Sequence, residues 1–448
     1  MSPRRASLET DLVRVGFTDI PLALDRIDAL SDAGLDAVLD PSDFALAADP
    51  DRALGVLAEI ALDCTVCQAV LTDPVHKTRL LSLLGASEAL GDFLRRHPQH
   101  GDAVTADDTT GSRERILAAA EGDSAVLDIR VAYRRELLGV ASRDLSGEAT
   151  LEVTMAELTE LADAALEACY RIAVRDVGDK AEQVDLAIIA MGKTGAAELN
   201  YISDVDVVFV CEPRTAHVSI DVAMRTGQQI ASRLMQIANA ATSEGSIWEV
   251  DAALRPEGKA GALVRTVDSY VAYYRKWAKT WEFQALLKAR PAAGDQHLGA
   301  RYVDSVADFV WTAADRENFV DDVQAMRRRV EEHIPAKEVN REIKLGKGGL
   351  RDVEFAVQLL QLVHGRSDVT LRSPNTLSAL EQLAVWGYVG REDASSMGTA
   401  YRFLRILEHR VQLRQMRRTH LLPERESELR VIARSMGMRR DPVAELAA

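Results

Sequence analysis

The sequence is poor in aromatic residues and contains no long apolar run. Aromatic residues make up only 5% of the 448 residues. No apolar stretch approaches the roughly 18 residues that a membrane-spanning helix needs. The basic residues near the start are not followed by an apolar segment, as a secretory signal requires. We therefore expect no membrane association and a cytoplasmic location.

Cysteine is also scarce, with four in the chain. Cys64 and Cys67 form a CxxC pair inside an apolar helical pattern. A zinc site needs a second Cys or His pair at ligand spacing, and the sequence offers none. The pattern predicts buried thiols in a reducing compartment.

The sequence has fewer basic than acidic residues, 54 against 69, so its formal net charge is −15 at pH 7. A protein that binds nucleic acid in general needs a basic face to neutralise phosphates, so this class is excluded. A local basic site for a nucleotide remains compatible with the charge. At 448 residues the chain is too long for one hydrophobic core, and we expect two to four domains or subdomains.

Apolar residues at spacings of three and four predict a helical N-terminal region over residues 1–182. Its helices are expected at 52–72, 77–95, 124–142 and 154–175. Helices return in a C-terminal helical bundle over residues 297–448, at 319–333, 350–364, 375–386 and 393–416. Ser373 and Pro374 suggest a helix start, with the serine as cap and proline in the first turn.

The pattern changes over residues 183–296. Residues 184–191 and 205–210 are short apolar runs rich in β-branched residues, which predict buried strands. A helix is expected at 219–241 and a third strand at 247–256, where a proline ends it. The sequence thus predicts a multidomain, mainly α protein with an inserted α/β domain.

Two carboxylates open the second predicted strand. Because strand side chains alternate, Asp204 and Asp206 project from one face about 7 Å apart. A solvated strand end would explain them, and so would bound divalent cations, which prefer hard oxygen ligands. The turn from Gly192 to Gly195, directly after the first strand, offers backbone N–H groups to a phosphate. Asp251 on the third predicted strand supplies another carboxylate.

Three carboxylates on adjacent strands could hold two Mg²⁺ ions about 4 Å apart, with Mn²⁺ as an alternative. Such a pair stabilises the entering and leaving oxygens of an in-line displacement at phosphorus. The residues themselves therefore point to metal-dependent nucleotidyl transfer, with Asp204, Asp206 and Asp251 as metal ligands and catalytic residues.

Four segments, in order, resemble the bifunctional glutamine synthetase adenylyltransferase/adenylyl-removing enzymes. They are residues 191–210 (MGKTGAAELNYISDVDVVFV), 250–259 (VDAALRPEGK), 281–295 (WEFQALLKARPAAGD) and 342–355 (EIKLGKGGLRDVEF). The resemblance implies a nucleotidyltransferase domain of the DNA polymerase β type. The chain departs from the family pattern at Thr194, Ala196, Ala197 and Ile202, which concern the shape of the site more than its carboxylates.

Family members carry two such domains in tandem, and this chain has one copy. Its Glu198-Leu199-Asn200 resembles the N-terminal, adenylyl-removing copy, because the C-terminal copy usually has glycine at the position of Asn200. The resemblance implies phosphorolysis: adenylylated glutamine synthetase and phosphate give active synthetase and ADP, in the control of nitrogen assimilation. The alternatives are ATP-dependent adenylylation by the same fold, or a non-catalytic module that docks the synthetase or a PII signalling protein.

An attacking phosphate must be held beside three carboxylates, which requires cations. The nucleotide- and phosphate-binding candidates in the four segments are Gly192, Lys193, Ser203, Arg255, Lys288, Arg290, Lys344, Lys347 and Arg351.

Several of these residues have a plainer interpretation. Residues 344–351 form either a phosphate loop or a tight turn. Asp352 and Glu354 are better explained as charges at a helix N-terminus than as metal ligands. Ion pairing with Glu282 would account for Lys288 and Arg290. Residues 277 and 281, both tryptophan, fit core packing on one helix face better than adenine stacking.

Overall fold

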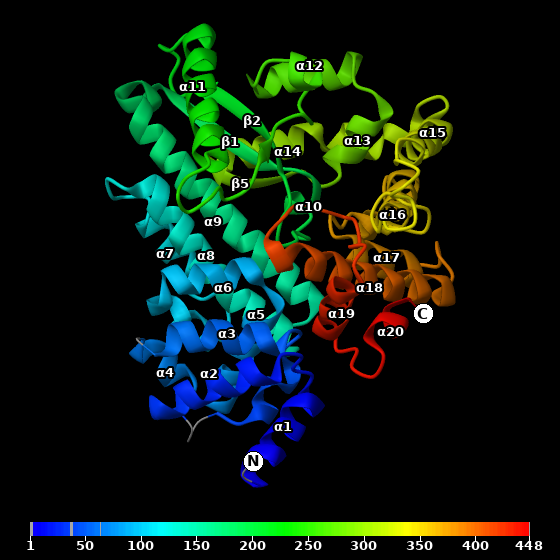
Figure 1. The fold of residues 1–448 in the computed structure, drawn as a ribbon. Coiled ribbons are helices and arrows are strands. Elements are labelled where there is room, and N and C mark those ends of the chain that lie inside the picture. The colour runs from blue at the N-terminus through cyan, green and yellow to red at the C-terminus, as the bar shows by residue number, and fades with distance from the viewer. Residues whose placement is uncertain (1–2, 36–38, 63, 448) are drawn as a thin grey trace. The chain divides into compact units, whose positions relative to one another are not determined.

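The computed structural model describes residues 3–35, 39–62 and 64–447 and is mainly helical (Figure 1). Its α-helices are α1 Pro3–Val15, α2 Ile20–Asp32, α3 Pro50–Ala61, α4 Thr65–Val70, α5 Pro74–Ala86, α6 Glu88–Arg96, α7 Ser112–Ala118, α8 Ala125–Ser146, α9 Leu151–Val177, α10 Gly192–Gly195, α11 Ile220–Asn239, α12 Val267–Lys276, α13 Thr280–Leu286, α14 Gln296–Trp311, α15 Phe319–Glu332, α16 Leu350–His364, α17 Thr376–Val385, α18 Arg391–Gln415, α19 Glu426–Ser435 and α20 Pro442–Ala447. The strands are β1 Val184–Ala190, β2 Val205–Pro213, β3 Val250–Asp251, β4 Val264–Arg265 and β5 Arg290–Gly294. Within the described residues, no helix is long and apolar enough to cross a membrane.

The chain folds into two compact units. Unit 1 comprises Met1–Thr110, Arg134–Glu157 and Arg405–Ala448, and unit 2 comprises Gly111–Tyr133 and Leu158–Leu404. Three of the four boundaries between the units fall within α8, α9 and α18, and the fourth, between Thr110 and Gly111, directly precedes α7. All five strands belong to unit 2, which also contains residues 297–404. The domain boundaries predicted from the sequence, at 182/183 and 296/297, stay a prediction.

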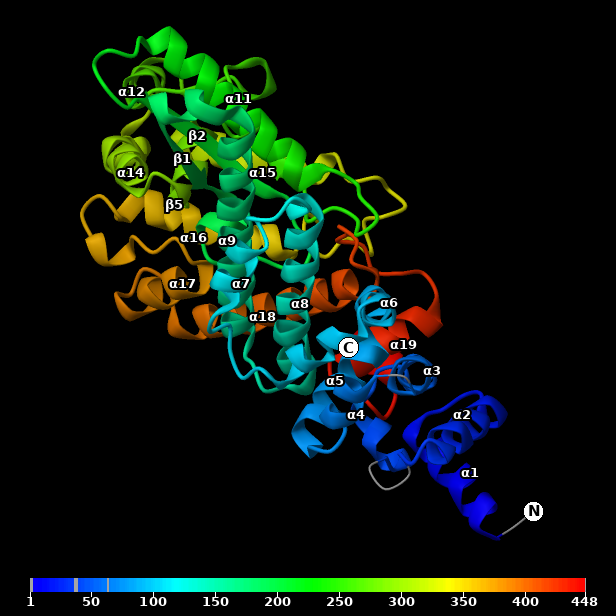
Figure 2. The same ribbon diagram turned by 90° about the vertical axis from the view of Figure 1, so that its left-hand side faces the viewer.

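Unit 2 is built on a mixed sheet with the strand order β3-β2-β1-β5, in which β4 also pairs with β2. β1 runs antiparallel to β2 and β5, whereas β3 and β4 run parallel to β2. α11 packs against β1 and β2, and α14 packs against β1, β2 and β5 (Figures 1 and 2). The two strands predicted at 184–191 and 205–210 are confirmed.

The two faces of the sheet follow from strand alternation. On one face, Ala187 and Ile189 of β1 lie opposite Val210 and Val208 of β2 and join the core that contains Tyr302 of α14. On the other face, the thiol of Cys211 donates to the carbonyl of Ala223 in α11, with 3.5 Å between the heavy atoms. Both faces are therefore covered, which explains why β1 and β2 read as continuous apolar runs.

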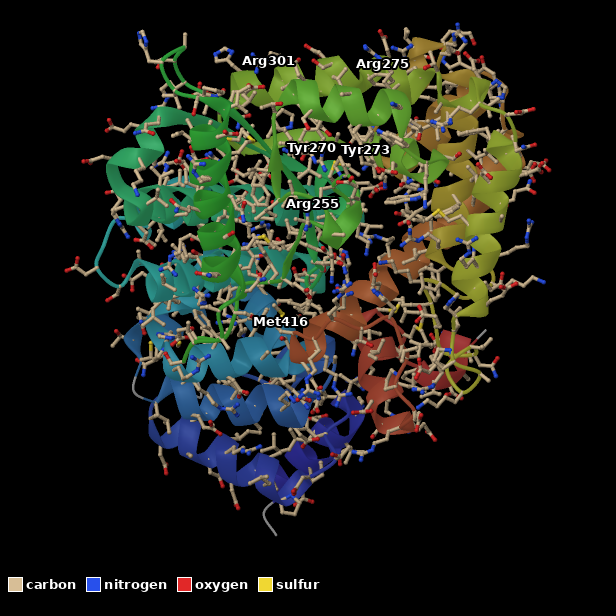
Figure 3. All side chains as sticks on the ribbon, turned by 90° about the horizontal axis from the view of Figure 1, so that it is seen from above. Arg255, Tyr270, Tyr273, Arg275, Arg301 and Met416 are labelled. Atoms are coloured by element: carbon tan, nitrogen blue, oxygen red, sulfur yellow. The ribbon has the colours of Figure 1, made fainter. Side chains whose placement is uncertain are left out.

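Buried tyrosines fix α12 and α14 on the sheet. The hydroxyl of Tyr270 donates to the carbonyl of Phe209 in β2 at 3.1 Å, and the hydroxyls of Tyr274 and Tyr302 are 3.3 Å apart. Figure 3 shows Tyr270 beside its neighbour Tyr273, on the helix that leads away from the loop of Arg255. Burial raises the pKa of Tyr270 and Tyr274 far above the usual range, so these hydroxyls stay protonated.

Most predicted helices are confirmed, but two are divided and one start is misplaced. The helix expected at 52–72 is two helices, α3 and α4, and that at 77–95 breaks at Ser87, whose hydroxyl accepts from the Leu90 N–H. α16 has the predicted bounds. Asn375, not Ser373, caps α17, and its side chain accepts from the Ser378 N–H at 3.0 Å. An amide oxygen closer to the first turn therefore replaces the predicted serine cap.

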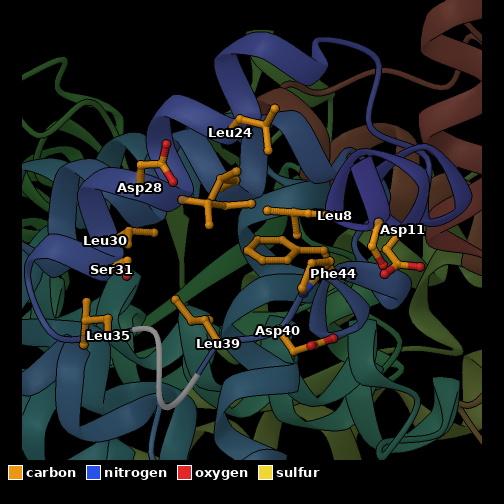
Figure 4. A pocket seen from close by; sticks show the side chains of 14 residues that line it. Leu8, Asp11, Leu24, Asp28, Leu30, Ser31, Leu35, Leu39, Asp40 and Phe44 are labelled. Atoms are coloured by element: carbon orange, nitrogen blue, oxygen red, sulfur yellow. The ribbon is translucent and has the colours of Figure 1, made fainter. Parts of the chain in front are cut away.

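Unit 1 is helical, and its cysteines are structural as predicted. Cys64 and Cys67 are buried and do not form a disulfide. Burial raises the pKa of the Cys67 thiol to about 12. A cavity of about 610 Å³ lies between α1, α2 and the 3-10 turn Pro41–Leu46, with leucines and Phe44 on its walls and Asp11, Asp28 and Asp40 at its edge (Figure 4). None of the predicted site residues lines it.

Candidate functional site

The three predicted carboxylates lie together at one edge of the sheet. Asp206 of β2 pairs in parallel register with Asp251 of β3, and Asp204 directly precedes β2. One carboxylate oxygen from each residue lies within 4.8 Å of the others, and all three side chains are partly exposed. The hydrogen bond from the Val205 N–H to the Glu249 carbonyl, 2.9 Å, holds β3 in this register. The arrangement is that of an acidic triad open to solvent on one side.

The glycine turn forms the wall behind Asp206. Gly192 begins α10 with a φ of +54°, a left-handed conformation that favours glycine, and a Cβ there would lie 2.3 Å from Asp206 Oδ2. The Met191 N–H donates to the backbone carbonyl of Asp206 at 2.8 Å. A Cβ at Gly195 would lie 1.8 Å from the Lys288 carbonyl. Gly192 therefore permits the close approach of the Asp206 carboxylate to α10, and Gly195 permits that of the Lys288 carbonyl.

The third strand, predicted at 247–256, is present only at two residues within that range. Only Val250–Asp251 pairs as a strand, and the chain then turns into a loop. Asp251 Oδ1 accepts from the Ala253 N–H at 2.7 Å, which begins the turn. The short strand is enough to place Asp251, because its neighbour Val250 is also held by the Asn239 side chain at the end of α11.

Arg255 organises this loop. Its guanidinium donates to the carbonyls of Ala252, Lys259 and Gly261, at 2.7, 3.1 and 3.2 Å. A guanidinium whose three nitrogens are engaged by carbonyls supports the loop behind Asp251, and this is a structural role for a residue predicted to bind phosphate.

Ser203 and Lys193 lie beside the triad. The Ser203 hydroxyl donates to Asp204 Oδ1 at 3.3 Å. Lys193 Nζ donates to Asn200 Oδ1 at 3.0 Å, and Asn200 Nδ2 donates to the Ile202 carbonyl at 3.1 Å. The buried Asn200 side chain thus connects α10 to the segment that leads into Asp204. Sequence reasoning had used this asparagine to distinguish the domain copies and had not foreseen its contacts.

Lys288 and Arg290, for which ion pairing with Glu282 and phosphate contact were equally good explanations, form ion pairs with other residues than Glu282. Lys288 Nζ lies 3.1 Å from Glu198 Oε2, and both residues are buried. Arg290 makes a bidentate contact with Asp163 of α9, at 2.7 and 3.0 Å, and donates to the Thr194 carbonyl in α10. Glu282 instead caps α13, where it accepts from the Lys279 N–H at 2.9 Å.

The glycine-rich segment 344–351 is a tight turn that carries cations. The Arg351 N–H donates to the Lys344 carbonyl at 3.0 Å, and the Gly349 N–H donates to the Gly346 carbonyl at 3.0 Å. Lys344 and Arg351 are partly buried and Lys347 is exposed. Asp352 accepts from the Gly348 N–H at 2.7 Å and pairs with Arg327. The predicted role of Asp352 as a helix N-terminal charge agrees with these contacts.

Glu354 differs from that prediction. It is only 6% exposed, and its Oε2 lies 3.6 Å from Arg351 Nε. Burial raises its pKa, but the charges of Arg351, Lys288, Lys344 and Lys193 together outweigh burial and lower the pKa to about 2. Arg351 therefore pairs with this buried carboxylate, and the charges of three further predicted phosphate-binding cations act on it.

The two tryptophans are not on one helix. α12 ends at Lys276, and Trp277 follows as its cap residue with 66% of its surface exposed, whereas Trp281 belongs to α13. The predicted core packing is therefore wrong for Trp277. Lys276 Nζ lies 5.0 Å from the centre of its ring.

Comparison with known proteins agrees with this geometry. The family model described as glutamate-ammonia ligase adenylyltransferase matches residues 77–305, and that described as GlnD PII-uridylyltransferase matches residues 274–447. The chain therefore belongs to a family of nucleotidyltransferases, the glutamate-ammonia ligase adenylyltransferases.

Curated relatives are named bifunctional glutamine synthetase adenylyltransferase/adenylyl-removing enzyme. The one from Streptomyces coelicolor is 52% identical, over 100% of this chain and 46% of its own length. That from Streptomyces avermitilis is 52% identical over 99% and 45%, and that from Mycobacterium tuberculosis is 49% identical over 83% and 38%. The chain thus spans about half the length of the relatives it matches, or less.

Proposed function

We propose that the chain removes AMP from adenylylated glutamine synthetase by phosphorolysis. An oxygen of inorganic phosphate forms a bond to the phosphorus of the tyrosyl-AMP linkage, and the bond from that phosphorus to the tyrosyl oxygen breaks. The products are ADP and the unmodified synthetase, whose tyrosine regains a proton. The observation that carries this proposal is the acidic triad of Asp204, Asp206 and Asp251 beside a glycine turn.

The donor set fits a divalent cation. Carboxylate oxygens are hard ligands, and oxygens bound to one octahedral Mg²⁺ ion lie about 3 to 4 Å apart. The triad offers three oxygens within 4.8 Å of one another. We propose that these residues hold Mg²⁺, two ions in all, with Mn²⁺ as a substitute. When bound, the ions would neutralise charge on the phosphoryl oxygens.

The surrounding residues divide into two roles under this proposal. Lys193, Lys344 and Arg351 are partly exposed cations that can face an anionic substrate. Arg255 and Arg290 hold the loop after Asp251 and the turn of α10, so they support the site from behind. Gly192 leaves room for the Asp206 carboxylate, because a side chain at this position would overlap with Asp206 Oδ2.

Asn200 supports the choice of the adenylyl-removing direction. Its side chain accepts from Lys193 Nζ and donates to the Ile202 carbonyl, and a glycine at this position would make neither contact. The site with asparagine is therefore built differently on the side where Lys193 lies. This supports the assignment of the chain to the N-terminal, adenylyl-removing half.

The test is product identity. Adenylylated synthetase incubated with the chain, Mg²⁺ and ³²P-phosphate should give labelled ADP, measured by chromatography. Asp206→Asn should lower the rate by more than about 100-fold, as loss of a charge-stabilising group does. Transfer of AMP from ATP to the unmodified synthetase, with no ADP formed from phosphate, would establish the forward reaction instead. A docking module would show neither reaction.

A PII signalling protein is a further proposed partner. Its support is the match of residues 274–447 to the model described as GlnD PII-uridylyltransferase. Calorimetric titration of the chain with a PII protein would test it, and absence of heat at micromolar concentrations would count against it.

A further inference from the structure

A cationic cluster in unit 2 includes Lys193, which directly follows the Gly192 against which Asp206 packs, and it contains two buried carboxylates. Its cations are Lys193, Lys288, Lys344 and Arg351, and its carboxylates are Glu198 and Glu354. Glu198 is 0% exposed and Glu354 is 6% exposed. Four positive and two negative charges leave the cluster with two positive charges.

Ion pairs and backbone hydrogen bonds join the cluster in two groups, one around Glu198 and one around Glu354. The charges of Lys193 and Lys288 in the first group also act on Glu354 in the second. Lys288 pairs with Glu198 at 3.1 Å, and the Glu198 N–H donates to the Lys193 carbonyl at 2.9 Å. Arg351 lies 3.6 Å from Glu354, and its N–H donates to the Lys344 carbonyl. Gly195, two residues after Lys193, packs directly on the Lys288 carbonyl. Segments far apart in sequence therefore converge on one place.

We propose that Glu354 is a positioning residue that holds Lys193, Lys344 and Arg351 as a preformed site for the attacking phosphate dianion. This rests on the proposed function, and it identifies the part of the site that takes the phosphate. Two surplus positive charges match the charge of a phosphate dianion. In the part of the chain that the structure describes, Arg351 Nε is buried without a hydrogen-bond partner and lies 3.6 Å from Glu354 Oε2, so a small shift of either side chain would complete a hydrogen bond between them.

A purely structural role explains Glu354 less well. Asp352, two residues earlier, already accepts a hydrogen bond from the Gly348 N–H at the start of α16. The N-terminus of this helix therefore has an acidic residue other than Glu354. A buried carboxylate is costly to desolvate unless cations compensate it. The same cations repel one another, and Glu354 allows them to remain close before substrate arrives. Preassembled charge of this kind lowers the reorganisation needed at the moment of reaction.

Positioning and simple charge balance predict opposite results for Glu354→Gln. If Glu354 only cancels positive charge, the variant has three surplus charges and should bind phosphate more tightly. If Glu354 holds the cations in place, the variant should bind phosphate more weakly. We expect the KM for phosphate to rise roughly tenfold, the size of one lost charge-assisted contact, with a smaller change in kcat.

The experiment measures ADP release from adenylylated synthetase at varied phosphate for wild type, Glu354→Gln and Glu354→Asp. Glu354→Asp keeps the charge on a shorter side chain and should recover part of the loss. Mn²⁺ affinity, measured by calorimetry, should be unchanged in both variants and shows that the triad is folded. An unchanged or lower KM for phosphate in a Glu354→Gln protein that binds Mn²⁺ normally would overturn the proposal.

Asp185→Asn is the matched control. It removes the 2.8 Å ion pair with Arg214 at the start of β1, the end of the strand away from the glycine turn. Like Glu354→Gln, this variant removes one negative charge from unit 2. Its KM for phosphate should stay at the wild-type value. A rise equal to that of Glu354→Gln would show a general charge effect and would also overturn the proposal.

Failure of the proposed function would be visible separately. If the wild type forms no ADP from phosphate, phosphorolysis is wrong whatever the variants do. Binding of ADP in the presence of Mn²⁺, followed by calorimetry, still tests the cluster, because ADP brings the phosphate that the attack would have supplied. Roughly tenfold weaker ADP binding by Glu354→Gln would support the positioning role, and equal binding would contradict it.

Discussion

Single residues decide the shape of the site, and Gly192 shows this most directly. Strand alternation was enough to predict that Asp204 and Asp206 would share a face, and the next strand supplied Asp251. The need for glycine at position 192 depends on the approach of Asp206 Oδ2 in three dimensions. Glu354 could not be assigned correctly, since its environment comes from cations on three other segments.

Gly192→Ala should impair the site more than the fold. A left-handed alanine costs about 1 kcal/mol, and a displaced carboxylate can lower kcat by about 100-fold. ADP release and Mn²⁺ affinity measure the two effects. Gly178→Ala is the control, because Gly178 has a φ of +71° and open space around its Cβ position. Equal rates for the two variants would contradict the predicted clash.

Glu354 should make folding stability depend on acid pH. Its pKa falls from about 4.5 in the unfolded chain to about 2 in the folded one. The stabilisation is therefore complete above pH 4.5 and disappears as the pH falls towards 2, with a full size of about 3 kcal/mol. Urea unfolding of wild type and Glu354→Gln should differ by this amount near pH 6, and the two free energies of unfolding should converge as the pH approaches 2. If the free energies of unfolding of the two proteins differed by a constant amount over this pH range, the lowered pKa of Glu354 would be contradicted.

At the scale of elements, long apolar patterns were predictable and short strands were not. β1 and β2 were correctly predicted because both faces are covered and their residues are β-branched. β5 has the sequence Arg-Pro-Ala-Ala-Gly and pairs with β1 only because the fold brings it there. β4 has two residues and exists through its pairing with β2. Local propensity gives no signal for such strands.

The end of α11 depends on one buried arginine of α8. Arg130 is 1% exposed and donates to the carbonyls of Ile237, Ala240 and Gly245, at 2.6, 2.8 and 2.9 Å. The adjacent Asn239 holds Val250, and thereby β3 with Asp251. The third carboxylate of the triad is thus positioned from a helix more than a hundred residues earlier in the chain.

Arg130→Met should destabilise the protein by about 3 kcal/mol, because several buried carbonyls lose their donor. Mn²⁺ affinity should fall as well, since β3 loosens. Urea unfolding and calorimetry measure the two changes. Arg175→Met removes an exposed arginine that donates to the carbonyls of Ala120 and Glu121, and it should change neither quantity appreciably. Wild-type Mn²⁺ binding by Arg130→Met would contradict the link to β3.

At the scale of the whole molecule, chain length predicted several domains but not which stretches of sequence form each of them. The two compact units are each assembled from separated stretches of chain, and three of their four boundaries fall inside continuous helices. A helical pattern carries no mark at such a point, because its apolar spacing continues unchanged. An α/β region within a helical protein could be predicted because the spacing of apolar residues changes from a helical to a strand pattern near Val184.

Metal binding should raise the melting temperature of the protein. A saturating ion stabilises the folded state by about 2.7 kcal/mol at 100 times its dissociation constant. Asp206→Asn should melt higher than wild type without metal, because it relieves repulsion between carboxylates, and should gain less from Mn²⁺. Scanning calorimetry with EDTA and with Mn²⁺ would show both effects. A variant that melts lower in EDTA and gains as much from Mn²⁺ as wild type would argue against the triad.

The buried thiols have a practical consequence for such experiments. All four cysteines are buried, and burial raises the pKa of Cys67, Cys169 and Cys211 to about 12. Thiolate is the species that maleimides attack, so the native chain should label slowly. A cysteine introduced at the 60% exposed Ile220 would then be a nearly exclusive attachment point for a fluorophore, with no need to remove the native cysteines.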